Sequence, residues 1–91
     1  MRGEKRGVQV NYSEINRRHC LEVLDLHEGV DTEERDVCAQ VQALRPSATK
    51  EEVADALAWL RTNGFAERRD KPLAGTVWRI TKEGTAALRS L

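Results

Sequence analysis

Several features of enzymes, membrane proteins and secreted proteins are missing from this sequence of 91 residues. No run of residues approaches the roughly 20 apolar side chains that a membrane span needs. The segment 1–10 has basic residues but lacks the apolar stretch of a signal peptide. Two cysteines are too few for a disulfide framework. We therefore expect a protein of the reducing cytoplasm that has no membrane partner.

Sequence signatures of catalysis and metal binding are also missing. The chain has no Gly-rich phosphate loop, no nucleophile elbow, no H-E-x-x-H and no C-x-x-C pair. The sequence therefore predicts no enzymatic activity, no metal site and no cofactor. Cys20 and Cys38 fall in apolar stripes of predicted helices, which indicates buried free thiols. A redox-sensing pair of thiols is the alternative interpretation of these two residues.

The charges cancel over the whole chain but not within its parts. Lys and Arg together number 15, as do Asp and Glu, so the protein is not globally basic. Residues 1–12 carry three basic and one acidic side chain, and residues 65–82 carry five and two, whereas the segment 13–64 carries six and eleven. Positive charge thus gathers at two places along the chain. We expect a basic N-terminal arm over 1–11 and one folded domain over 12–91.

Hydrophobic periodicity and capping residues predict two helices in the first half of the domain. The first covers about 13–28 and ends at Gly29, which can adopt the left-handed conformation at a helix C-terminus. The second covers 31–45. Asp31 and Glu34 have the spacing of a capping box at its start.

The third predicted helix has the clearest start and stop signals. Thr49 and Glu52 have capping-box spacing, and apolar residues follow at helical intervals as far as Leu60. Asn63 and Gly64 then predict the end of this helix, with Gly64 in the left-handed conformation.

A β-hairpin and a short final helix are predicted after it. Extended stretches at 65–69 and 76–80 flank a turn that contains Pro72 and Gly75. Alternation places Val77 and Arg79 on one face of the second strand and Trp78 on the other, with Trp78 in the core. Thr81 then follows as the N-cap of the last helix.

The order of three helices, a hairpin and a closing helix defines a mainly α, α+β domain. The stretches VADALAWLRTNGFAERR and VWRITKEGTAAL resemble winged helix-turn-helix domains of the MarR/PadR-like kind. Such domains show an apolar helix ending in Leu-x-x-x-Gly-(apolar), a charged wing strand, and then Thr-x-x-Gly-x-x-x-Leu. The corresponding residues here are Leu60, Gly64, Phe65, Thr81, Gly84 and Leu88.

The resemblance implies a small DNA-binding protein, a transcriptional regulator of a prokaryote or of a mobile element. The helix from Thr49 would then be the recognition helix in the major groove, and residues 65–80 would form the wing. In the recognition helix we expect DNA contacts from Thr49, Lys50 and Arg61. In the wing and just after it, we expect phosphate contacts from Arg68, Arg69, Lys71, Arg79 and Lys82. A hairpin charged only for solubility is the alternative interpretation.

Two features of the third helix favour a different class of partner. The face opposite its apolar stripe carries Glu51 and Asp55, which would oppose the negative potential of DNA. Trp59 lies on the flank of the same helix, where it either packs within the monomer or contacts a partner. The alternative function is therefore a winged-helix module for protein–protein interaction. Because one such module contacts few phosphates, we also expect a homodimer that forms through the first and last helices.

Overall fold

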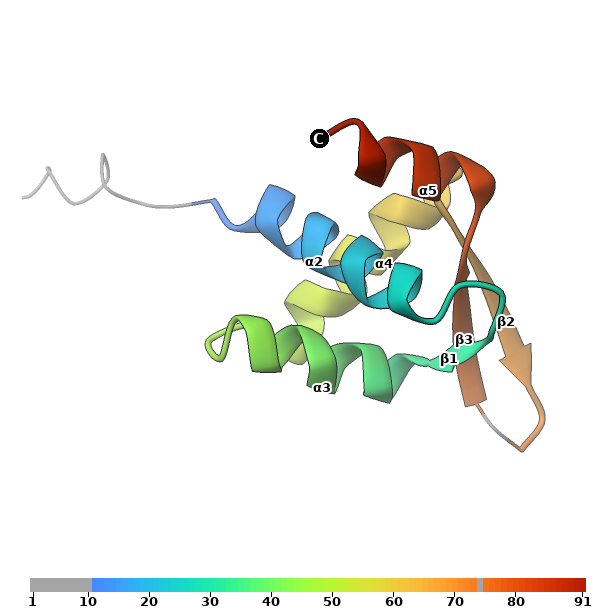
Figure 1. The fold of residues 1–91 in the computed structure, drawn as a ribbon. Coiled ribbons are helices and arrows are strands. Elements are labelled where there is room, and N and C mark those ends of the chain that lie inside the picture. Colours follow the sequence, from blue (N-terminus) through green and yellow to red (C-terminus); the bar gives the residue numbers. More distant parts are fainter. Residues whose placement is uncertain (1–10, 74) are drawn as a thin grey trace, which may run out of the picture.

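A computed structural model describes residues 11–73 and 75–91, which form four helices and three short strands (Figure 1). The elements follow the order α2 (Ser13–Leu26), β1 (Thr32–Glu33), α3 (Glu34–Leu44), α4 (Lys50–Thr62), β2 (Ala66–Lys71), β3 (Gly75–Ile80) and α5 (Lys82–Arg89). This order confirms the predicted fold class, a helix-turn-helix followed by a hairpin wing and a short final helix. The predicted arm lies outside the described residues except at Asn11.

The strands form one antiparallel sheet in the order β1-β3-β2. β3 is therefore the central strand. It pairs with β2 from Ala66 opposite Ile80 to Lys71 opposite Gly75, and with β1 at Thr32 and Glu33. The hairpin of β2 and β3 projects from one end of the helices beside the start of α3, whereas α5 packs against α2 (Figure 1).

Local signals account for the boundaries of α4. The Thr49 hydroxyl accepts a hydrogen bond from the backbone N–H of Glu52, and the Glu52 carboxylate accepts one from the backbone N–H of Thr49. The predicted capping box is thus confirmed. After the helix, Gly64 has a φ of 79°, and the N–H of Phe65 donates to the carbonyl of Leu60 over 2.8 Å. These two features form the predicted glycine stop.

The start of α3 differs from the prediction. The prediction of a capping box between Asp31 and Glu34 is wrong, because Glu33 is the N-cap and its side chain makes no capping hydrogen bond. Residues 32–33 are instead extended and pair with β3. The Glu34 carboxylate accepts a hydrogen bond from Nε1 of Trp78 over 2.8 Å. Strand pairing and this contact from a distant residue therefore replace the local cap.

The core lies between the three longer helices and the inner face of the sheet. Trp78 is 3% exposed, which confirms its predicted place in the core, and Cys20 and Cys38 are buried free thiols. The largest side chains of the helical core are almost fully inaccessible, namely Val23, Leu24, Val37, Val41, Val53, Leu57 and Leu60. The apolar stripes of the sequence thus converge on one cluster.

Arg45, in the turn between α3 and α4, ties the helices together. Its side chain is only 12% exposed. The guanidinium donates hydrogen bonds to Oδ1 of Asn16 on α2, to Oγ of Ser47 in the turn and to Oε1 of Glu52 on α4. It also lies 4.1 Å from the ring centroid of Tyr12. Because Asn16 is 3% exposed, this contact also satisfies a buried polar group.

We predict that Gly84→Ala destabilises the domain by about 3 kcal/mol, as in an overpacked core. Gly84 is buried at the start of α5. A Cβ there would overlap the carbonyl oxygen of Phe65 and lie 2.8 Å from Cγ1 of Ile80. Urea unfolding measures the effect.

The exposed Ala86 of the same helix provides the control, because Ala86→Gly should cost only about 1 kcal/mol through helix propensity. If Gly84→Ala were as stable as the unmodified chain, this result would contradict the close packing of Gly84 in α5 against the backbone of Phe65.

Candidate nucleic-acid interface

The exposed surface of α4 divides into a basic and an acidic part. Lys50 and Arg61 lie along one flank of the helix, and Glu51 and Asp55 lie on the outward face. All four are exposed. Thr49 is also exposed, but its hydroxyl accepts the capping hydrogen bond from Glu52. The hydroxyl proton of Thr49 can still be donated to an acceptor outside the chain.

Lys50 opens onto a groove between α3 and α4. Ala54 lines this groove from α4, and Arg35, Ala39 and Gln42 line it from α3. Sequence analysis did not identify Arg35 as a candidate site residue. Arg35 lies among the acidic residues 33, 34 and 36, so the charge of its segment gave no indication of a cation site. Only the packing of α3 beside α4 places it on the groove that Lys50 also lines.

A second hollow lies where α4 ends and the wing begins. Arg61 lines it together with two of the predicted wing residues, Arg68 and Arg69. Thr81 and Glu83 complete this hollow from the start of α5. Three of the predicted cations therefore border one hollow, although Arg61 is separated from the other two in the sequence and Arg68 and Arg69 alternate between the two faces of β2. Lys82 follows Thr81 and is exposed.

Two other predicted wing cations are held by an acidic side chain of the chain itself. The Asp31 carboxylate pairs with Nζ of Lys71 over 2.8 Å and with Nε of Arg79 over 3.1 Å. The hydrogen bond from Lys71 is the main cause of a lowered pKa of the Asp31 carboxyl, and the charge of Arg79 adds to it. These contacts fasten the wing to the segment before β1.

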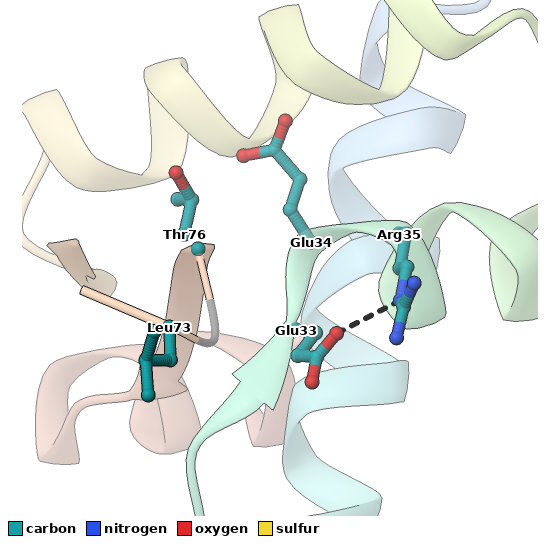
Figure 2. Close-up of a pocket in the computed structure, with 6 residues that line it drawn as sticks. Glu33, Glu34, Arg35, Leu73 and Thr76 are labelled. Atoms are coloured by element: carbon teal, nitrogen blue, oxygen red, sulfur yellow. Dashed lines mark ion pairs between the residues drawn. The ribbon is translucent and has the colours of Figure 1, made fainter. Parts of the chain in front are cut away.

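A third hollow separates the wing turn from the start of α3 (Figure 2). Leu73, Gly75 and Thr76 line it from the wing, and three consecutive residues line it from the other side, Glu33, Glu34 and Arg35. Nε of Arg35 pairs with Oε1 of Glu33 over 2.8 Å (Figure 2). The Arg35 side chain is nevertheless 82% exposed. Arg35 thus belongs to both the wing hollow and the groove beside α4.

Trp59 lies on the opposite flank of α4 and is 37% exposed. The Arg17 guanidinium lies 4.2 Å from the centroid of its ring, and the ring of Phe65 lies 6.0 Å away. Trp59 therefore packs within the monomer on two sides and still presents part of its ring to solvent. The predicted packing within the monomer is thus present, and the contact with a partner stays a prediction.

The geometry around the cysteines and histidines offers little chemistry. Burial is the main reason why the pKa of the Cys20 thiol rises to about 12, and nearby Cys38 and Glu34 add to the rise. A thiol with that pKa is a poor nucleophile. In residues 11–73 and 75–91, no group of three or more His, Cys, Asp or Glu side chains is arranged to hold a metal ion. No helix in that part of the chain is long and apolar enough to cross a membrane.

The fold is also found in a known regulator. The solved structure of the Helicobacter pylori ferric uptake regulator Fur, reported to have three functional metal binding sites, is similar with a TM-score of 0.65 and 16% sequence identity. The similarity covers 85% of this chain and 49% of that regulator, so this chain spans about half its length. No protein-family model and no curated protein sequence matches this chain. The similarity supports the winged-helix fold and, at this identity, nothing finer.

We predict that the stabilising effect of Asp31 depends on pH. Because its folded-state pKa is lowered, its contribution to stability is fully present above about pH 4 and is lost as the pH falls through the folded-state value. The difference in unfolding free energy between the unmodified chain and Asp31→Asn should therefore shrink between neutral and strongly acidic pH. Urea unfolding at several pH values measures this difference.

Asp55→Asn is the matched control, because it removes an exposed carboxylate for which no ion pair is found among the described residues. A difference for Asp31→Asn that stays constant down to strongly acidic pH would contradict the pairing with Lys71 and Arg79.

Proposed function

We propose that this protein binds double-stranded DNA as a small winged-helix transcriptional regulator of a prokaryote or a mobile element. The observation that carries the proposal is a hollow between the end of α4 and the wing that Arg61, Arg68 and Arg69 border. Guanidinium groups form strong, directional hydrogen bonds with phosphate oxygens. Within winged-helix proteins, the motif residues from Leu60 to Leu88 support a MarR/PadR-like member.

In this proposal the cations position the protein and α4 reads the bases. Contacts to phosphates fix the register on the duplex, and contacts to base edges in the major groove supply specificity. Lys50 and the hydroxyl of Thr49 are the first polar groups at the N-terminal end of α4. The proposal assigns no catalytic residue and no cofactor.

We further propose that the protein acts in the cytoplasm as a homodimer. One domain of this size contacts few phosphates, and a dimer contacts two half-sites. The candidate faces of the dimer are on α2 and α5. The last residue of α2, Leu26, is exposed, and so is Leu91, which follows α5.

The double variant Arg68→Ala/Arg69→Ala should weaken binding to duplex DNA. Removal of two phosphate contacts should also lower the slope of log K against log salt concentration by about 1.8. Mobility-shift assays over a range of salt concentrations measure both effects.

Arg18→Ala/Arg89→Ala is the control, because it removes the same charge from two exposed arginines outside the wing. Since these residues lie on α2 and α5, light scattering must first verify that this variant keeps the oligomeric state of the unmodified chain. Equal losses for the two double variants would indicate attraction by net charge alone. The absence of binding by the unmodified chain at low salt would contradict the proposed function.

Protein binding is the second candidate function, and partial exposure of Trp59 beside the acidic face of α4 favours it. Large aromatic side chains are frequent anchors of interfaces. If this candidate holds, Trp59→Ala should abolish co-purification of a defined partner while the circular dichroism spectrum stays unchanged.

Leu44→Ala provides the control, since it truncates an exposed apolar side chain on α3. Retention of the same partner by Trp59→Ala would exclude Trp59 as the anchor.

A further inference from the structure

Two strips with different chemistry run along α4. Residues at intervals of three or four share one side of a helix. By this spacing Lys50, Ala54, Ala58 and Arg61 form one strip, with a cation at each end and small side chains between them. Glu51 and Asp55 lie beside it on the outward face. We call the first set the basic strip.

Neighbouring elements add further cations to the hollows that the basic strip borders. In the groove that Lys50 and Ala54 line, the first turn of α3 contributes Arg35. Beside Arg61, the wing contributes Arg68 across the second hollow. The ion partners of these two arginines are partly exposed acidic groups, Glu33 at 2.8 Å and Asp70 at 3.4 Å. Such exposed pairs are weak, so a phosphate can compete for the guanidinium groups.

The cations on the outer face of the sheet are in a different situation. Lys71 and Arg79 share the Asp31 carboxylate, whose side chain is only 16% exposed. Successive residues of a strand point to opposite faces of the sheet. Arg68 is paired with the buried Trp78, whereas Lys71 and Arg79 occupy the alternate positions and therefore lie on the opposite side of the sheet from Arg68. A surface that includes both Arg68 and Arg79 would have to bend around the wing.

The length of the basic strip fits the width of a DNA groove. Lys50 and Arg61 are eleven residues apart, which corresponds to about 16 Å along a helix. The major groove of B-DNA is about 12 Å wide. Cations at the two ends of the strip can therefore reach phosphates on opposite walls of the groove, while Ala54 and Ala58 allow a close approach of the helix.

From these observations we infer that double-stranded DNA docks along the basic strip, where Arg35, Lys50, Arg61 and Arg68 hold phosphates and the acidic face of α4 is turned aside. Charge complementarity identifies the partner as a polyanion. The inference rests on the proposed DNA-binding function and adds to it a docking surface and a new phosphate-binding residue, Arg35. It also excludes Lys71 and Arg79 from direct phosphate contact.

Salt-dependent fluorescence anisotropy with a labelled duplex tests this inference on the full chain. Arg35→Ala and Arg61→Ala should each lower the slope of log K against log salt concentration by about 0.9, the value for one phosphate contact. Lys71→Gln should leave the slope unchanged. Arg18→Ala is the matched control, because the Arg18 side chain is 60% exposed and pairs only with Glu22 among the described residues. Thermal unfolding verifies that each variant is folded.

Each outcome of this experiment supports or overturns the docking surface. A slope for Arg35→Ala equal to that of the unmodified chain would overturn the role of Arg35. A slope lowered by Lys71→Gln, but not by Arg61→Ala, would move the DNA to the outer face of the sheet. Failure of the unmodified chain to bind any duplex would instead remove the proposed function, and the inference with it.

Discussion

The guanidinium of Arg45 joins two helices that are distant in the sequence. It donates to Asn16 on α2 and to Glu52 on α4 while it stacks on Tyr12. Glu52 is also the residue that caps α4 through the N–H of Thr49, and this hydrogen bond is the main cause of its lowered pKa, with the Arg45 charge as a further cause. The start of α4 is thus capped and oriented by the same carboxylate. The direction in which α4 presents Lys50 depends on this arrangement.

Asp31 has a comparable effect on the wing. By pairing with Lys71 and Arg79 it fastens the hairpin beside the start of α3. The charge of these two cations is partly neutralised, whereas Arg68 is left on the side of the sheet that faces the helices. Asp31, which was predicted to cap a helix, is therefore the ion partner of two of the wing cations.

Sequence reasoning succeeded where the relevant interactions are local. The capping box at Thr49 and the glycine stop at Gly64 depend on residues within five positions of each other, and both are confirmed. It failed at Asp31, because pairing of residues 32–33 with β3 brings in partners more than forty positions away. Arg35 was missed for the same reason, since its neighbours on α4 are not evident from the local sequence.

The fold and the presence of the hairpin were predictable from apolar periodicity and turn residues, because one buried cluster must accept every apolar stripe. The division of the surface charge between the two faces of the wing was not predictable, because it depends on which side chains pair across the sheet. The net charge of +3 over 65–82 counted all wing cations alike. In the folded domain they lie on two faces and have different ion partners.

The proposed DNA-binding surface consists of α4, the first turn of α3 and the inner side of the wing. Titration of the ¹⁵N-labelled chain with a short duplex, followed by ¹H–¹⁵N correlation spectra, locates the residues that contact DNA. Chemical-shift changes should concentrate at residues 35, 50–61 and 68, with small changes at Lys71 and Arg79. Changes centred on Arg17 and Trp59, or no changes at low salt, would contradict it.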